Sequence, residues 1–284
     1  MVPLKAISAL TLVLLMPVAS RSRPDSDTGS LEDSLFAQSA ARALNRNFPD
    51  PAISFLLFDA HHGQLLASRW DQANSPVPLG SLAKPFAALA YGEQHGFRYP
   101  MHTCRGSETG CWRPGGHGEV DLTSAIALSC NSYFRLLTRE LTAADMSSTA
   151  DRFGLDLPDR DAHGSELAGL GPRWRISPLR MAWAYLELLR ARQQPGVEQI
   201  LAGMERSAAN GTGAEVNRVL RSRKALVKTG TAACTHLPPA PGDGFAIALL
   251  PAEDPRFLVM VRVHGVPGSM AARTAGQMLQ LIEE

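Results

Sequence analysis

Lysine is scarce in this chain. Of its 28 cationic side chains, only Lys5, Lys84, Lys224 and Lys228 are lysines, and the other 24 are arginines. Arginine can supply surface charge, but its pKa is too high for it to act as a base, whereas a desolvated lysine can lose its proton. Lys84 lies in the apolar run PLGSLAKPFAALAY, residues 78–91. This placement indicates either a chemical role or a lysine whose stem covers apolar surface while its ammonium group reaches water.

The patterns of several protein classes are absent as well. The net charge is only +1, and no run of five or more like charges occurs, so the sequence predicts neither a nucleic-acid interface nor binding to an anionic membrane. It contains no G-x-G-x-x-G and no P-loop, which argues against nucleotide binding. It also lacks H-E-x-x-H and G-x-S-x-G, the motifs of metalloproteases and α/β-hydrolases. The hydrophobic content of 45% is enough for a sizeable core.

Apolar runs approaching membrane length occur only at the N-terminus. Residues 6–19 are almost wholly apolar, which is too short to cross a bilayer comfortably, and a polar stretch follows them. Small residues at positions 18–20 provide a cleavage site. We therefore expect a signal peptide over 1–20, a linker over 21–30 and a folded domain over 31–284, with an exported mature chain that has no transmembrane span. The alternative is an uncleaved anchor.

Strand-like runs occupy both ends of the chain, with helix-like runs between them. Residues 52–59 and 64–70 predict a β-hairpin, and three more strand-like runs, KALVKTGTAA, GFAIALLP and RFLVMVRVHG, follow Arg223. This order predicts an α/β fold of the α+β type, in which an antiparallel sheet built from N- and C-terminal strands is flanked by helices and carries an all-α subdomain. A helix is expected to carry Ser81 and Lys84, and others are expected at residues 121–141, with a break near Ser129, at 176–192 and at 269–283.

The first of three short motifs is Ser81-Leu82-Ala83-Lys84, the only S-x-x-K in the chain. A spacing of three places both end residues on one face of a helix. A serine hydroxyl is a poor nucleophile unless a base within hydrogen-bond reach takes its proton. Lys84 could be that base if its pKa fell from about 10.4 toward 7, and burial beside another cation is one way to lower it.

The other two motifs follow in order along the chain. The only K-[ST]-G lies at residues 228–231 (KTGT), where Lys228 could be the second cation and could hold a substrate carboxylate. Gly230 would let a substrate backbone lie close to the strand; the alternative is an exposed lysine on an edge strand. The only S-x-N lies at residues 129–131 (SCN). Its hydroxyl could relay a proton and its amide could hold a substrate carbonyl, although serine and asparagine are also common at helix breaks.

Together and in this order, the motifs resemble the signature of β-lactamases and penicillin-binding proteins. The likeness to the transpeptidase domain of penicillin-binding proteins covers roughly residues 50–284, through FDAHHGQLLA, PLGSLAKPF, GHGEVDLTSAIALSCNSYF, GLGPRWRISPLRMAWAYLELL and LVKTGTA. The resemblance implies a β-lactamase/transpeptidase-like fold and a catalytic domain over 31–284. It further implies a periplasmic or otherwise extracytoplasmic serine D,D-transpeptidase or D,D-carboxypeptidase. Such an enzyme acts on the D-Ala-D-Ala end of peptidoglycan stem peptides, is acylated by β-lactams and needs no cofactor.

The resemblance also implies a role for each motif residue. Ser81 would be the acylated nucleophile and Lys84 its base, while Ser129 would shuttle a proton and Asn131 would orient the acyl donor. The backbone N–H groups of Ser81 and Thr231 would form the oxyanion hole. The third motif would bind the substrate, and its terminal carboxylate in particular, through Lys228, Thr229, Gly230 and Thr231.

Two other functions stay open. A class D-like β-lactamase shares S-x-x-K and K-T-G, but that group usually has valine in place of Asn131. No E-x-x-L-N lies between the second and third motifs, so the deacylating glutamate of class A β-lactamases has no candidate. A catalytically inactive penicillin-binding or sensor module would keep the site without the activity, although sensors of this type need membrane helices to signal.

The four cysteines are an even number, and export permits disulfides. Cys104 and Cys111 flank a six-residue loop, and we expect them to form a disulfide, which leaves the chain without a metal site. Alternatively, these two cysteines with His102 and His117 could bind zinc, or they could be free thiols. The remaining cysteines are expected to be reduced, small core residues: Cys130 and Cys234.

Overall fold

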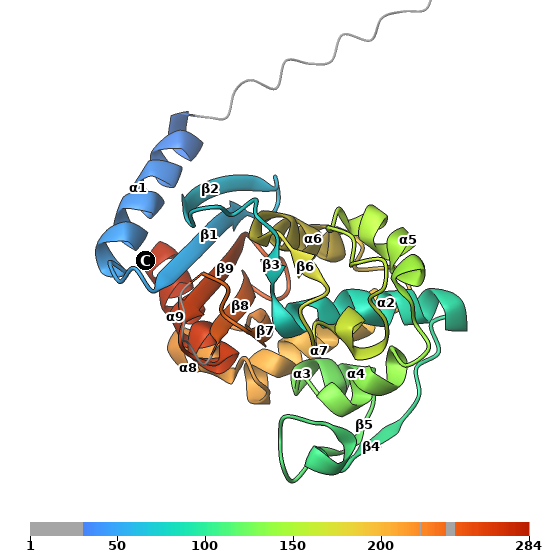
Figure 1. Ribbon diagram of the computed structural model, residues 1–284. Helices are drawn as coiled ribbons and strands as arrows, with labels where there is room; N and C mark the ends of the chain where they lie inside the picture. Colours follow the sequence, from blue (N-terminus) through green and yellow to red (C-terminus); the bar gives the residue numbers. More distant parts are fainter. Residues whose placement is uncertain (1–30, 222, 237–241, 284) are drawn as a thin grey trace, which may run out of the picture.

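The centre of the protein is an antiparallel five-stranded sheet in the order β2-β1-β9-β8-β7 (Figure 1). The computed structural model describes residues 31–221, 223–236 and 242–283, so the expected signal peptide and linker lie outside the described residues. The sheet confirms the prediction that strands from the two ends of the chain pair with each other. Its strands are β1 (Ile53–Asp59), β2 (Gln64–Arg69), β7 (Leu226–Ala232), β8 (Asp243–Leu250) and β9 (Phe257–His264).

The sheet separates two apolar cores, because successive side chains of a strand point to opposite faces. On β8, Phe245 and Ile247 belong to the core of one face, whereas Ala246 and Ala248 belong to the core of the other. The helix α9 (Gly268–Glu283) packs on the alanine face and presents alanines of its own. Small residues on both partners let this helix lie close to the sheet.

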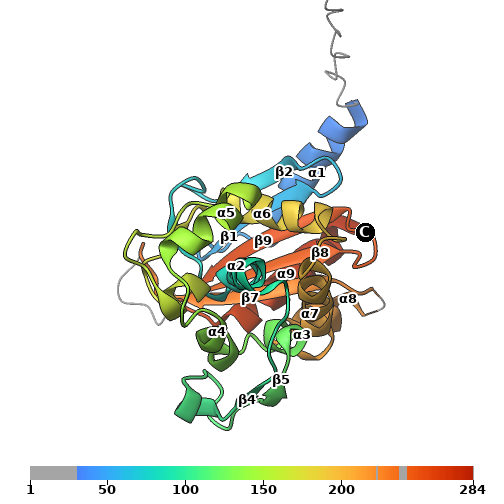
Figure 2. The ribbon, with the colours of Figure 1, turned by 90° about the vertical axis from the view of Figure 1, so that its right-hand side faces the viewer.

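Two groups of helices cover the two faces (Figures 1 and 2). One face carries α1 (Leu31–Asn47), α8 (Ala214–Leu220) and α9. The described part of the chain contains no helix that is both long enough and apolar enough to cross a membrane. The other face carries α2 (Lys84–His95), α3 (Leu122–Ala127), α4 (Asn131–Leu137), α5 (Ala143–Phe153), α6 (Pro178–Arg190) and α7 (Val197–Asn210).

Shorter elements connect these helices. Two small antiparallel pairs join β3 (Val77–Pro78) to β6 (Arg175–Ile176) and β4 (His102–Cys104) to β5 (Gly118–Val120), and the second pair projects at the bottom of Figure 1. The described residues also form the 3₁₀ turns η1 (Gly80–Ala83), η2 (Gly106–Thr109) and η3 (Gly164–Ala168).

The expected helices at 176–192 and 269–283 are confirmed as α6 and α9, and the helix expected at 121–141 is broken, as predicted, between α3 and α4. The expectation that one helix carries both Ser81 and Lys84 was wrong in detail. Ser81 lies in η1, and α2 begins at Lys84. Pro85 occupies the first turn of α2, where the missing N–H has no intrahelical partner to lose.

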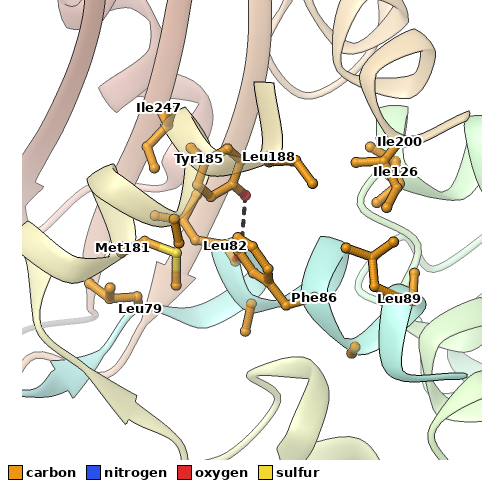
Figure 3. Packing of buried hydrophobic residues seen from close by; sticks show 14 of the residues in the cluster. Leu79, Leu82, Phe86, Leu89, Ile126, Met181, Tyr185, Leu188, Ile200 and Ile247 are labelled. Atoms are coloured by element: carbon orange, nitrogen blue, oxygen red, sulfur yellow. Dashed lines mark hydrogen bonds between the residues drawn. The ribbon is translucent and has the colours of Figure 1, made fainter. Parts of the chain in front are cut away.

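The helix α2 is enclosed by the other elements of its layer (Figure 2). From η1 and α2, Leu82 and Phe86 pack against Met181 and Tyr185 of α6, as Figure 3 shows. The Tyr185 hydroxyl donates a hydrogen bond of 2.9 Å to the carbonyl oxygen of Leu82, and its ring meets Phe86 edge-on. A helix that is apolar on most of its circumference is stable only when buried in this way. Its packing fixes the position of Lys84 at its first residue.

Candidate active site

The turn that carries Ser81 packs directly on the backbone of β7. Gly80 has a φ of +59°, and a Cβ atom at this position would lie 2.2 Å from the carbonyl oxygen of Thr231. Only glycine satisfies both the left-handed conformation and this close approach. The first and third motifs are therefore joined main chain to main chain, and Ser81, with only 9% of its area exposed, lines the pocket.

Gly230 serves the same contact from the other side. A Cβ atom there would lie 2.5 Å from the carbonyl oxygen of Leu79, which precedes the first motif. The predicted reason for this glycine was access for a substrate backbone. In the structure the glycine is needed to seat the turn that carries Ser81, and because Gly230 also lines the pocket, the approach of a substrate backbone stays a prediction.

Both motif lysines are completely buried, which excludes a snorkelling Lys84 and an exposed Lys228. The Lys84 Nζ donates hydrogen bonds to the Ser129 carbonyl oxygen at 2.8 Å, to Ser129 Oγ at 3.3 Å and to Asn131 Oδ1 at 2.6 Å. The Lys228 Nζ donates to the same Ser129 Oγ at 3.0 Å and to the Thr229 carbonyl oxygen at 2.8 Å. The Ser129 hydroxyl thus lies between the Nζ atoms of the two lysines, and the three motifs meet at this point.

The environment of the two lysines disfavours their charged forms. Burial lowers the pKa of Lys84 to about 7, while negative charge on Cys130 and Cys111 opposes this shift and the charge of Arg135 adds to it. The pKa of Lys228 lies well below its ordinary value because of burial and, secondarily, because of the charge on Lys84. The expected fall in the Lys84 pKa is present, and desolvation rather than a neighbouring cation is its main cause. Near neutral pH a large fraction of Lys84 is a free amine.

Lys84 directs its hydrogen bonds to the second motif rather than to Ser81. Among the hydrogen bonds of the described residues, none joins Ser81 Oγ to Lys84 Nζ. An ammonium group has three N–H donors, and Lys84 uses all three on Ser129 and Asn131. A neutral amine has two donors and a lone pair, so loss of one proton frees Lys84 to accept a hydrogen bond from a nearby hydroxyl.

The loop between α3 and α4 holds the second motif in a strained conformation. Ser129 has a φ of +48°, which a residue with a side chain rarely adopts. Trp112 covers this loop, and its Nε1 donates to the carbonyl oxygens of Leu128 and Ser129, both at 3.2 Å. The indole is about half exposed and lines the pocket. A tryptophan alone gave no reason to expect this role, because the contact joins segments 16 residues apart.

A cavity of about 580 Å³ opens above these groups. Sequence reasoning missed several of its lining residues, among them Arg113, Thr212, Arg218 and Ser269. The Thr212 hydroxyl is paired with that of Thr229 at 2.6 Å, and Arg218 pairs with Glu215 of its own helix. The lining also includes six predicted residues: Ser81, Ser129, Asn131, Thr229, Gly230 and Thr231.

The expected disulfide is not formed, since Cys104 and Cys111 are free thiols. Instead, the Nδ1 atom of His117 lies 3.6 Å from Cys104 Sγ and 3.5 Å from Cys111 Sγ, and Cys111 Sγ lies 3.9 Å from Cys130 Sγ. These four donor atoms all lie within 4.8 Å of one another. The β4–β5 pair and the second motif thus bring three thiols and one imidazole to a common point, so the two cysteines are part of a larger set rather than a bonded pair.

The donor set differs from the zinc alternative considered above. His102 is not a member, because its Nε2 is hydrogen-bonded to Ser132 Oγ at 2.6 Å, and Cys130 takes its place. In a tetrahedral zinc site with ordinary bond lengths, two thiolates lie roughly 3.8 Å apart and a thiolate lies roughly 3.5 Å from an imidazole nitrogen. The measured separations match these values. The second motif therefore contains a residue, Cys130, that belongs to a candidate metal centre, and another member of this centre, His117, lines the pocket.

The fold is that of the β-lactamase/transpeptidase class, as comparison with solved structures shows. Residues 53–280 match the family model of the penicillin-binding protein transpeptidase domain, and the chain belongs to this family. It is similar to the peptidoglycan D,D-transpeptidase MrdA of Acinetobacter baumannii, with 31% identity over 80 residues. That match spans 25% of this chain and only 11% of MrdA.

Two solved structures illustrate how far the similarity of fold extends. Pseudomonas aeruginosa PBP2, crystallised with WCK 5153, has a TM-score of 0.69 at 17% identity, and the alignment covers 88% of this chain and 73% of that one. Helicobacter pylori PBP2, in its complex with MreC, has a TM-score of 0.71 at 19% identity, with 87% and 63% covered. The likeness to these structures therefore concerns the fold, and the chemistry has to be argued from the site.

Proposed function

We propose that this chain is an exported serine D,D-acyltransferase that acts on the D-Ala-D-Ala end of peptidoglycan stem peptides and is acylated by β-lactams. The main support is the buried Lys84 amine, whose pKa lies near 7, hydrogen-bonded to the second motif beneath the pocket that contains Ser81. Such an amine can take a proton from an alcohol at neutral pH, which an exposed lysine cannot do efficiently.

Acylation would begin with proton transfer from Ser81 Oγ to the neutral Lys84 amine. The serine oxygen then attacks the carbonyl carbon of the scissile D,D-amide, and the backbone N–H groups of Ser81 and Thr231 hold the resulting oxyanion, a device typically worth about 3 to 4 kcal/mol. The proton passes from Lys84 through the Ser129 hydroxyl to the leaving nitrogen as the C–N bond breaks. The product is an ester on Ser81 and free D-alanine.

The remaining motif residues would bind the substrate. The side-chain oxygen of Asn131 accepts a hydrogen bond from Lys84. Its side-chain nitrogen can therefore donate a hydrogen bond to the acyl donor. Lys228 is buried and donates to Ser129 and to the backbone, so we assign it the role of holding the Ser129 hydroxyl beneath the pocket rather than direct contact with the substrate. Contact with the terminal carboxylate then falls to Thr229 and Thr231, which line the cavity.

The test uses a fluorescent penicillin, whose strained amide mimics the D,D-amide. We expect covalent labelling of the purified chain and no labelling of Ser81→Ala. Ser68→Ala, which changes an exposed serine of β2, is the matched control and should be labelled like the unchanged protein. Absence of labelling, or labelling that survives Ser81→Ala, would show that the proposal is wrong.

The possible activities differ in the acyl acceptor, which is water in a D,D-carboxypeptidase and an amine in a D,D-transpeptidase. Mass spectrometry after incubation with cross-linkable muropeptides should show either loss of D-alanine, the mark of a D,D-carboxypeptidase, or cross-linked products, the mark of a D,D-transpeptidase. Rapid release of hydrolysed penicillin would favour the class D-like β-lactamase. A stable penicillin adduct without any muropeptide product would favour the inactive binding or sensor module.

We also propose that Cys104, Cys111, His117 and Cys130 hold a structural zinc ion. The support is the mutual proximity of their donor atoms, three of whose separations have the values of a tetrahedral zinc site. Such an ion would anchor Cys130 and, through it, the strained backbone of the neighbouring motif residues. Cys104→Ser should reduce the zinc content of the purified chain by one equivalent and slow penicillin acylation. Unchanged zinc content would contradict this assignment.

A further inference from the structure

A second group of metal-type donors lies at one edge of the sheet, outside the cluster described above. It consists of Cys234, His236, Asp243 and His264, whose donor atoms all lie within 4.8 Å of one another. We propose that these four residues bind a zinc ion that ties together the strands β7, β8 and β9. This inference concerns a structural site and does not depend on the proposed reaction.

The sheet topology brings the four residues together. Ala232, Asp243 and His264 occupy one row of the sheet, as register partners across β7, β8 and β9. Cys234 and His236 follow directly after the end of β7. Because neighbouring strands are antiparallel, the end of β7, the start of β8 and the end of β9 meet at the same edge.

The distances between donor atoms fit one small ion. Asp243 lies in the middle, with Oδ1 at 2.8 Å from His264 Nδ1 and Oδ2 at 3.3 Å from His236 Nδ1. Cys234 Sγ lies 3.2 Å from His236 Nδ1 and 3.4 Å from His264 Nδ1. Ligands of a tetrahedral zinc ion are separated by roughly 3.3 to 3.6 Å. Two of the four distances, 3.3 Å and 3.4 Å, lie within this range, and the separations of 3.2 Å and 2.8 Å are shorter, so a bound ion would move these ligands slightly apart.

The chemical character of the set favours zinc over other common ions. One thiolate, two imidazoles and one carboxylate form the mixture of nitrogen, sulfur and oxygen donors that zinc accepts, whereas calcium and magnesium require oxygen ligands. The thiolate and the carboxylate carry two negative charges, which a divalent ion neutralises. Asp243 is almost completely buried, at 4% side-chain exposure, whereas the two imidazoles retain 31% and 23%. The site is therefore enclosed on the protein side and open to solvent on the histidine side, where an ion can enter.

The position of this site connects it to the wall of the pocket. Cys234 lies three residues beyond Thr231, and His264 lies three residues before Pro267, and both Thr231 and Pro267 line the cavity. The two segments already touch, since the Gly268 N–H donates to Thr231 Oγ1 at 3.0 Å. An ion bound to both segments would hold this contact and so preserve the shape of the pocket on the side of the third motif.

The test is the metal content of the full chain, measured by mass spectrometry of the purified protein after exposure to zinc and removal of excess metal. His236→Ala removes the most exposed ligand and should lower the zinc content by one equivalent per chain, with the fold retained by circular dichroism. His61→Ala, which removes another partly exposed histidine outside both clusters, is the matched control and should leave the content unchanged. Equal zinc content in His236→Ala and the unchanged protein would overturn the proposal.

A second measurement separates this site from the first cluster. In the double variant Cys104→Ser, Cys111→Ser, cobalt should still bind with a thiolate charge-transfer band, and this band should disappear when Cys234→Ser is added. Failure of cobalt to give a thiolate band in the double variant, or persistence of the band without Cys234, would also overturn the proposal. Either result leaves the penicillin-labelling test of the proposed function unaffected.

Discussion

The two walls of the pocket are held in place by different kinds of contact. On one wall, the turn that carries Ser81 lies against β7, and the contact depends on missing side chains at Gly80 and Gly230 and on the apolar packing of α2. On the other wall, the strained loop at Ser129 is held by buried ammonium groups and an indole, with thiols behind it. The first wall is part of the core. The second is a polar assembly, and it is the wall that carries the groups able to move protons.

The largest effect is expected where the two walls meet, at Lys84. Lys84→Arg keeps the positive charge but removes the proton acceptor, since a guanidinium is not deprotonated in proteins. We expect the rate constant for acylation by a fluorescent penicillin to fall by about 10³ to 10⁴-fold, within the range of general base catalysis. Lys224→Arg, at an exposed lysine, should leave the rate unchanged. A rate in Lys84→Arg within tenfold of that of the unchanged protein would refute the assignment of the base.

The first wall can be broken by a single methyl group. Gly80→Ala places a Cβ atom 2.2 Å from a backbone oxygen at a positive φ, and we expect it to lower the free energy of unfolding by about 2 to 4 kcal/mol. Gly118→Ala is the matched control, because Gly118 also has a positive φ, of +72°, but open space around it. It should cost only the backbone strain, about 1 kcal/mol. Urea unfolding measures both values, and equal losses would mean that the close approach to β7 contributes nothing.

On the second wall, two variants of Ser129 distinguish the effect of its hydroxyl from the effect of its strained backbone. Ser129→Ala and Ser129→Gly both remove the acceptor shared by two lysines, and we expect acylation to fall by about 100-fold in each, from loss of the proton relay. Ser129→Gly should be about 1 kcal/mol more stable than Ser129→Ala, because glycine tolerates the positive φ. Acylation rates and unfolding curves measure the two effects. If acylation were slow in only one of the two variants, the assignment of the proton relay to the Ser129 hydroxyl would be wrong.

The smallest expected effect is a dependence on pH. With a Lys84 pKa of about 7, the fraction of neutral amine rises about tenfold between pH 6 and pH 8, and the acylation rate should rise with it and then level off.

The same lowered pKa makes the free energy of unfolding depend on pH. The pKa in the folded state is lower than in the unfolded chain, so the unfolded chain binds more protons between pH 7 and 10.5 and stability from this group increases across that window. Lys84→Met should make the measured increase smaller and leave the part that comes from Lys228, which unfolding curves at several pH values would measure.

Features that depend on local sequence patterns could be predicted, whereas contacts between distant segments of the two walls could not. The strands and helices follow from apolar runs and their periodicity, as in the alternation of β8, and the helix break at Ser129 was visible in the local sequence. The motif residues could be placed in one pocket because their pattern resembles a known family. The contact of Gly230 with Leu79 could not be predicted, because it joins distant segments and no local pattern encodes it.

The cysteines show the same limit. Cys104 and Cys111 are near in sequence, so pairing them was the simplest interpretation, but the partners that the fold supplies are His117 and Cys130. Cys130 directly precedes α4, on a different element from the β4–β5 pair. Convergence of this kind depends on how the β4–β5 pair docks against α3 and α4, which periodicity cannot specify.

The burial of two lysines makes the protein convenient to attach to a surface or a dye. Within the described part of the chain, Lys224 is exposed, with 66% of its side chain accessible, while Lys84 and Lys228 are fully enclosed. An amine-reactive reagent should therefore couple to Lys224 without entering the pocket. The rate of coupling at Lys84 and Lys228 would in turn measure how often local opening of α2 or β7 exposes these amines to the reagent.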